Sequence, residues 1–294
     1  MAAATATAQS IDLTLDEYRV LVEAQPGLEV LPILRAGVIP ATAPERRRSA
    51  EESLRDRALL TGGDEAVVRI DPVLATGMLT LLGPPLLLQV KSWDPDTTSS
   101  TAAALLDGSS VTLTVTVPRD RTAVETDPTT AVTGSVRFTF GDLGSAITAI
   151  SELTSGAPAE PDHVPLERLE LGLVEMQAIS DAVRTADAET LSAVERQLGL
   201  PGARRFVAPL TVPLEAGLKL RLLARPGRLA YAATWVQGAD RVWVRTGLGG
   251  VRRDDGTVDR DSVVDGGRLS LARQPISTLE VDLLAVLTRL AVTS

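Results

Sequence analysis

The spacing of apolar residues changes along the chain, and the changes separate helices from strands. In several stretches Leu, Val, Ile and Ala recur every three or four residues, which is the pattern of amphipathic helices. Capping boxes, which pair Ser or Thr with Glu three residues later, mark helix starts at Thr14, Thr42 and Ser277. The pattern predicts helices over residues 15–24, 44–60, 72–82, 143–153, 166–183, 188–198 and 277–291.

Strict alternation of apolar and polar residues marks other stretches as strands. Residues 111–117 read Val-Thr-Leu-Thr-Val-Thr-Val, and residues 136–140 alternate in the same way. Such segments have one buried and one solvated face, as in an antiparallel sheet. Further strands are expected at 86–93, 218–222, 228–236, 241–245 and 268–271. The predicted fold class is therefore α+β, an antiparallel sheet flanked by helices.

The order of these elements is repeated. Each half of the chain has helices, then alternating strands, then one closing amphipathic helix. Gly134–Phe140 and Gly266–Ala272 occupy matching places before the two closing helices. This order favours two structurally related halves. Chance resemblance within an ordinary α+β chain is the alternative.

The boundaries follow from composition. Residues 155–164 are rich in proline and form a hinge. We expect a single domain over residues 11–294, with an N-terminal half at 11–154 and a C-terminal half at 165–294. Residues 1–10 are expected to be disordered, and they lack the basic and apolar regions of a signal peptide. The chain is therefore expected to be cytoplasmic.

Composition then removes several classes of function. The 294 residues are 44% hydrophobic but only 3% aromatic, so an aliphatic core is expected. The net charge of −9 disfavours nucleic-acid binding, which needs clustered positive charge. Without cysteine there are no disulfides or thiolate nucleophiles, and a single histidine leaves little metal or general-base chemistry. We expect no enzyme, no cofactor and no metal.

The remaining candidates for chemistry are weak. His163 lies in the hinge, and an exposed linker histidine is favoured over a general base. The glycines at 247–250 are not followed by a helix, so they lack the N–H cluster that binds a pyrophosphate. The aspartates between 254 and 265 are interleaved with arginines, which favours a solvated loop over a calcium site.

One strand carries a possible partner surface. On the segment 241–245, Trp243 shares a face with Arg241 and Arg245, and Trp and Arg are enriched at protein-binding hot spots. The alternative, slightly favoured, is that a helix of the same chain covers this face. The long connection 118–133 between two strands is a second place to contact a partner.

The order of short motifs resembles the EspG family, the cytosolic chaperones of actinobacterial ESX (type VII) secretion systems. The motifs are Leu15–Tyr18, a Thr-x-Pro-Glu-Arg helix start at 42–46, the sheet entry Leu82–Pro85, and the glycine-rich turns 249–256 and 265–269. The last stretch departs from the family pattern, since a Thr is missing and Leu269 stands where Tyr is usual.

The resemblance implies binding without catalysis, on a quasi-two-fold α+β fold. Family members hold the apolar tip of a helical secretion substrate, typically a PE–PPE pair, and keep it soluble; a WXG100-like substrate is the other possibility here. The family's cleft maps onto the connection 118–133, the Trp243 strand and the helix 277–291. The partner-binding residues expected from this mapping are Arg241, Trp243, Arg245, Val124, Leu283 and Leu287.

Two other functions compete with this hypothesis. A small-ligand or lipid carrier predicts an enclosed apolar cavity of a few hundred cubic ångströms, about the size of known ligand pockets. An enzyme would have to rely on carboxylates alone, and this hypothesis is the weakest of the three. A chaperone instead predicts exposed Leu, Val and Trp in a cleft without converging polar groups.

Overall fold

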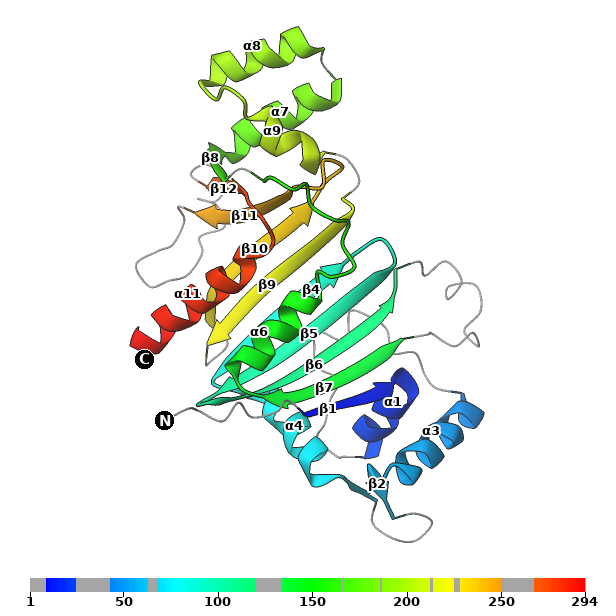
Figure 1. The fold of residues 1–294 in the computed structure, drawn as a ribbon. Coiled ribbons are helices and arrows are strands. Elements are labelled where there is room, and N and C mark those ends of the chain that lie inside the picture. The colour runs from blue at the N-terminus through cyan, green and yellow to red at the C-terminus, as the bar shows by residue number, and fades with distance from the viewer. Residues whose placement is uncertain are drawn as a thin grey trace. The chain divides into compact units, whose positions relative to one another are not determined.

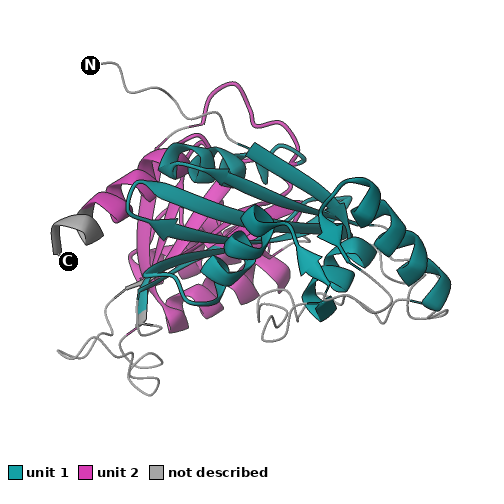
Figure 2. Cartoon of the chain, turned by 90° about the horizontal axis from the view of Figure 1, so that it is seen from below, with its two compact units in different colours: residues 1–156, 220–231 teal, residues 157–219, 232–294 magenta. Residues whose placement is uncertain are grey.

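A computed structural model describes residues 9–24, 43–62, 68–119, 134–164, 166–185, 187–211, 214–224, 228–249 and 267–293. The chain divides into two compact units (Figure 2). Unit 1 comprises Met1–Gly156 with Leu220–Tyr231, and unit 2 comprises Ala157–Lys219 with Ala232–Ser294. Both contain helices and antiparallel strands (Figure 1), which confirms the α+β class.

Unit 1 begins with a strand that runs directly into a helix. Two further helices follow, with a two-stranded ladder between them in the chain. A run of long strands and a closing helix come next. The elements are β1 (Gln9–Thr14), α1 (Leu15–Ala24), α3 (Pro44–Asp56), β2 (Leu60–Thr61), β3 (Arg69–Ile70), α4 (Pro72–Leu82), β4 (Leu86–Trp93), β5 (Thr97–Leu106), β6 (Ser109–Pro118), β7 (Ser135–Gly141) and α6 (Leu143–Glu152).

The strands of unit 1 pair in the order β1-β7-β6-β5-β4, and each pair is antiparallel. One face of this sheet is apolar and packs against α1, α3 and α4. Val136, Phe138 and Leu113 on the strands are buried in one cluster with Leu21 and Leu54 of the helices. The alternation of apolar residues therefore sets which face becomes the core.

The opposite face of the unit 1 sheet is rich in Thr and Ser, and α6 packs on it. The buried side chains of α6 are Ala146, Ile147 and Ile150, which recur at helical spacing. Asp142 begins this helix by accepting the Ser145 N–H at 2.8 Å. Asp142 is therefore the N-cap of α6.

Unit 2 also begins with a strand that runs into a helix, and it ends with a long closing helix. The elements that lie wholly in it are β8 (Glu167–Gly172), α7 (Leu173–Thr185), α8 (Ala188–Leu198), α9 (Arg204–Val207), η1 (Ala208–Leu210), β11 (Trp243–Gly249), β12 (Arg268–Arg273) and α11 (Thr278–Thr293). Strands β9 (Ala216–Ala224) and β10 (Arg228–Gln237) each contribute residues to both units. In unit 2 the strands pair in the antiparallel order β10-β11-β12-β8.

Several helix starts are where the local signals predict them. At α1 the capping box is complete: the Thr14 N–H donates to Glu17 at 2.7 Å, and the Glu17 N–H donates to the Thr14 hydroxyl at 3.1 Å. Asp71 caps α4, and Asp187 caps α8. Each of these caps acts between residues at most three positions apart, so it depends little on the rest of the fold.

The predicted long helix from 166 to 183 is wrong in its first third. Glu167–Gly172 is strand β8, paired with β12, and the helix begins only at Leu173. Leu166, Leu169 and Leu173 recur at helical spacing, whereas Leu169 and Leu171 alternate as on a strand, so the short segment is ambiguous by period alone. Pairing with β12 decides the matter in favour of a strand.

Three smaller expectations also change. Gln9 and Ser10 belong to β1, so the expected disorder of residues 1–10 does not hold for these two. Helix α3 has Ala43 as its N-cap, without a side-chain hydrogen bond, and it ends at Asp56 rather than near residue 60. Strand β5, absent from the prediction, lies between β4 and β6; its Thr, Ser and Ala residues carry no strong alternation.

Candidate functional site

The structure buries three of the six residues expected to bind a partner, namely Trp243, Leu283 and Leu287. Trp243 is 1% exposed, and Val242 and Val244 beside it are also buried. Strand β11 starts at Trp243, so Arg241 precedes it, in a turn with a positive φ of 58°. Arg245 forms an ion pair with Asp282 of α11 at 3.2 Å. Both faces of β11 are covered at Trp243, so this side chain is part of the core.

Helix α11 has two apolar sides. The residues that the sequence predicted to bind a partner lie on the buried side. Leu283 and Leu287 are 2% and 8% exposed. Val281 and Leu284 point the other way and are 66% and 46% exposed. Ala285 and Thr288 are exposed too, so positions 281, 284, 285 and 288 form one continuous stripe at helical spacing. We call these four residues the outer stripe of α11.

Other expected sites lie outside the described residues. Val124 and the connection at 120–133 are among these, as is the aspartate-rich segment 254–265. His163 is described, and it is exposed.

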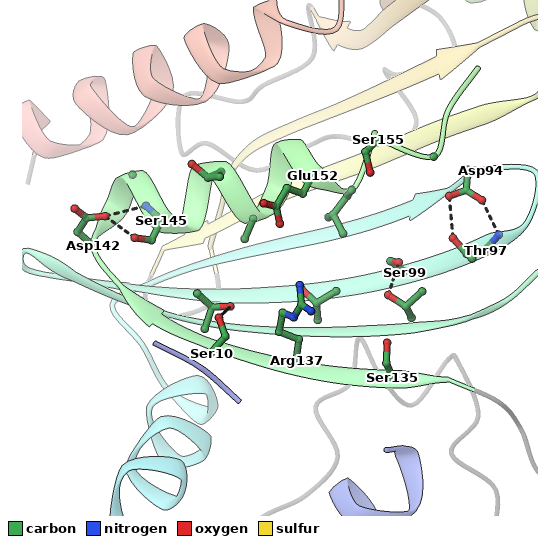
Figure 3. A pocket seen from close by; sticks show the side chains of 18 residues that line it. Ser10, Asp94, Thr97, Ser99, Ser135, Arg137, Asp142, Ser145, Glu152 and Ser155 are labelled. Carbon is green, nitrogen blue, oxygen red and sulfur yellow. Dashed lines mark hydrogen bonds between the residues drawn. The ribbon is translucent and has the colours of Figure 1, made fainter. Parts of the chain in front are cut away.

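A cavity lies within unit 1, between α6 and the Thr- and Ser-rich face of the sheet (Figure 3). Its volume is about 940 Å³. Asp142 and Ser145 stand at one end, Asp94 and Thr97 at the other, and Arg137 points up from β7 between the sheet and the helix. No motif in the sequence predicts this cavity.

Alternation on the strands supplies the hydroxyl lining. On β6 the odd residues Val111, Leu113 and Val115 are buried in the core, so the even threonines face the cavity side. Cross-strand pairing then joins hydroxyls: Ser99 meets Thr116 at 2.8 Å, and Thr101 meets Thr114 at 2.9 Å. In each pair one hydroxyl donates to the other. Ser99, Thr114 and Thr116 also line the cavity.

The charges of the cavity are largely paired. Arg137 donates to Asp12 on β1 at 2.6 Å. The hydrogen bond and the charge of Asp12, together with the charge of Glu152, hold the pKa of Arg137 above its usual range. Asp94 accepts hydrogen bonds from the N–H and the hydroxyl of Thr97 at 2.6 and 2.8 Å.

At one end of the cavity a carboxylate lies beside a serine, since the Ser145 hydroxyl donates to Asp142 at 2.8 Å. Hydrogen bonds from the Ser145 N–H and hydroxyl lower the pKa of Asp142. A carboxylate with a lowered pKa is a weak general base, because it holds a transferred proton poorly. This pair therefore caps a helix and is poorly suited to nucleophilic catalysis.

The cavity can bind polar groups through hydroxyls, but its lining is unlike that of an apolar ligand site. Its residues include Ser99, Thr114, Ser135, Thr139, Thr148 and Ser155. The Val-Thr alternation of β6 already indicated a polar sheet face. Helix α6 leaves part of this face open. No local signal in the sequence predicts this, because it depends on where the helix packs.

The described residues offer neither a metal site nor a membrane-spanning helix. They contain no group of three or more His, Asp or Glu side chains placed to hold a metal ion. None of their helices is long and apolar enough to cross a membrane. Comparison with protein-family models and with curated proteins finds no match to this chain.

Proposed function

We propose that this chain is a cytoplasmic, non-catalytic adaptor of the EspG type, which holds the apolar tip of a helical ESX secretion substrate. The substrate is a PE–PPE pair or a WXG100-like protein, and the adaptor keeps it soluble until export. The observation that carries the proposal is the outer stripe of α11, an apolar helix face with its largest side chains in solvent.

The proposal includes a fold of two related halves, and the hydrogen bonds support it. In unit 1, β1 runs into α1, and the Thr14 N–H at the junction donates to Glu17 at 2.7 Å. In unit 2, β8 runs into α7, and the Gly172 N–H donates to Glu175 at 2.6 Å. In each half, the glutamate three residues after the strand–helix junction accepts a hydrogen bond from the N–H of the junction residue.

The strand registers match as well. Thr14 pairs with Ser135, the first residue of β7, and Gly172 pairs with Arg268, the first residue of β12. Both β7 and β12 then lead into a closing helix, α6 or α11. A shared register and a shared junction are harder to obtain by chance than a shared order of elements.

The outer stripe suits a helical partner. Its residues 281, 284, 285 and 288 repeat at the spacing with which one helix packs along another. Contiguous apolar side chains left in solvent are typical of an interaction site. The net charge of −9 keeps the adaptor itself away from neutrality, which favours its solubility.

The lipid-carrier alternative finds less support. It predicts an enclosed apolar cavity, whereas the cavity described in unit 1 is lined by hydroxyls, carboxylates and a guanidinium. An apolar ligand placed there would desolvate these groups without replacing their hydrogen bonds.

The test is co-purification of the tagged chain from the organism that encodes it, followed by mass spectrometry. The double variant Val281→Asp with Leu284→Asp should lose a co-purifying helical ESX-type substrate by at least about tenfold. Burying one Val or Leu side chain contributes about 1.5–3 kcal/mol, so losing two exceeds that factor.

The matched control is Leu79→Asp, because Leu79 of α4 is 50% exposed and lies in unit 1. This variant should recover the substrate as the unchanged chain does, and all variants should melt at similar temperatures. Recovery of no ESX-type substrate by the unchanged chain, or equal recovery by the double variant, would refute the proposal.

A further inference from the structure

Strand β8 forms an open edge of the unit 2 sheet. It pairs with β12 on one side, and in the described residues no strand lies on its other side. Arg168 and Glu170 on this strand are exposed. An unpaired edge is a template for another strand, and proteins generally cover or blunt such edges.

The backbone groups that face outward can be assigned by parity. In an antiparallel ladder successive residues point their N–H and C=O alternately toward the partner strand and away from it. The Gly172 N–H donates to the Glu175 carboxylate at 2.6 Å, so it points away from β12. Glu170 and Arg168 have the same parity, and their N–H and C=O groups therefore point outward as well.

The corresponding edge of unit 1 is blocked at Asp12. There the Arg57 guanidinium donates to the carbonyl oxygen of Asp12 on β1 at 2.6 Å. Asp12 stands two residues before the strand–helix junction at Thr14, as Glu170 stands two before Gly172. No hydrogen bond among the described residues reaches the outward groups of Arg168 or Glu170. Within the described residues, the β8 edge at Arg168 and Glu170 is therefore free to pair with another strand.

We propose that a second copy of this chain binds here, with the two β8 strands pairing antiparallel about Leu169. This register places Arg168 opposite Glu170 of the other copy, and Glu170 opposite Arg168. Both residues have outward N–H and C=O groups, so each of the two pairs closes a hydrogen-bonded ring. Directly opposite unlike charges stabilise a strand pair.

The neighbouring registers are excluded by charge. Only registers that set outward-facing residues opposite each other can form these hydrogen bonds, so one strand can shift along the other only by two residues at a time. One such slip sets Arg168 against itself, and the other sets Glu170 against itself. Like charges directly opposite each other destabilise a strand pair. The sequence of β8 therefore selects one two-fold register.

The ends of the edge add an apolar contact. Leu166, just before β8, and Val174, just after it, are each 75% exposed, the highest values among the large apolar side chains of the described residues. In an antiparallel pair the start of one strand lies beside the end of the other. The two-fold axis thus brings Leu166 of each copy toward Val174 of its mate.

The experiment measures mass by light scattering at protein concentrations up to about 100 µM, where a pair with a Kd of about 10 µM is mostly dimeric. The unchanged chain should approach twice 31.0 kDa. Arg168→Glu and Glu170→Arg should each weaken the dimer by at least about tenfold, because each creates two like-charge pairs. The double variant, with both changes, should return to within about threefold of the unchanged chain.

Lys91→Glu, an equivalent charge reversal at an exposed strand residue of unit 1, should leave the mass unchanged. A monomeric unchanged chain, single variants that dimerise as it does, or a double variant that stays monomeric would overturn the proposal. The inference rests on the β8 edge alone. It can therefore fail while the adaptor function holds, and the reverse is also true.

Discussion

The sequence around Trp243 is compatible with two roles, a partner-binding hot spot and a core residue, and only its surroundings in the fold distinguish them. Its position between two arginines is typical of a binding hot spot, yet it is 1% exposed. Its backbone carbonyl accepts the Gln274 N–H at 3.1 Å, which ties the start of β11 to the segment that leads into α11. Its role is therefore in packing.

Replacing Trp243 tests this role directly. Trp243→Ala should lower the free energy of unfolding by about 3–5 kcal/mol, because it removes a buried aromatic side chain and leaves a cavity. Leu284→Ala on the outer stripe should change it by less than about 0.5 kcal/mol, as exposed substitutions do. Denaturant titration of both variants gives the comparison. A Trp243→Ala variant as stable as the unchanged chain would return Trp243 to the candidate binding residues.

At the scale of elements, helix starts depend on short-range hydrogen bonds. Asp142 accepts the Ser145 N–H at 2.8 Å, and Asp187 accepts the Thr190 N–H at 2.8 Å. These bonds lower the pKa of both carboxylates. An acid with a lowered folded-state pKa stabilises the fold above its unfolded pKa, and that contribution is lost as the pH falls through the folded value.

The double variant Asp142→Asn with Asp187→Asn isolates this effect. Asn keeps an acceptor oxygen for the cap but does not titrate in this range. Both proteins should lose stability as the pH falls from about 5 toward 3, since other carboxylates titrate too, but the double variant should lose less. Chemical unfolding at a series of pH values measures the difference. Superimposable pH curves would show that the caps do not contribute to acid sensitivity.

At the scale of the whole chain, the net acidic charge and the polar lining of the unit 1 cavity limit the kinds of ligand that the protein can bind. The chain has 38 acidic and 29 basic side chains. In the unit 1 cavity Arg137 lies near Glu152, and hydroxyls line the sheet side. Polar linings of this kind bind water or polar ligands rather than hydrocarbon chains.

We therefore expect the purified chain to contain no apolar ligand at stoichiometric level. Native mass spectrometry should give the mass of the chain, 31.0 kDa, or of its dimer, without an adduct. Organic extraction of the same sample should yield no lipid in molar amounts. Recovery of one lipid per chain would revive the carrier hypothesis and direct attention to a cavity other than the hydroxyl-lined one.

The sequence by itself determined the elements whose signals are local. Thr14 with Glu17, Asp71 with Pro72, and Asp187 each begin a helix where expected, because a cap satisfies N–H groups only two or three residues away. The Val-Thr alternation of β6 likewise fixed a strand with one apolar and one hydroxyl face, because strand side chains alternate in direction.

Only the tertiary structure decided which of two equivalent patterns is used. Glu167–Gly172 fits a helix or a strand, and pairing with β12 made it a strand. Helix α11 has two apolar stripes, and packing buried the one with Leu283 while leaving Leu284 in solvent. The open part of the unit 1 cavity depends on where α6 lies. The physical reason is common to all three: a sequence pattern states which residues prefer burial, but the available partners decide which of them obtain it.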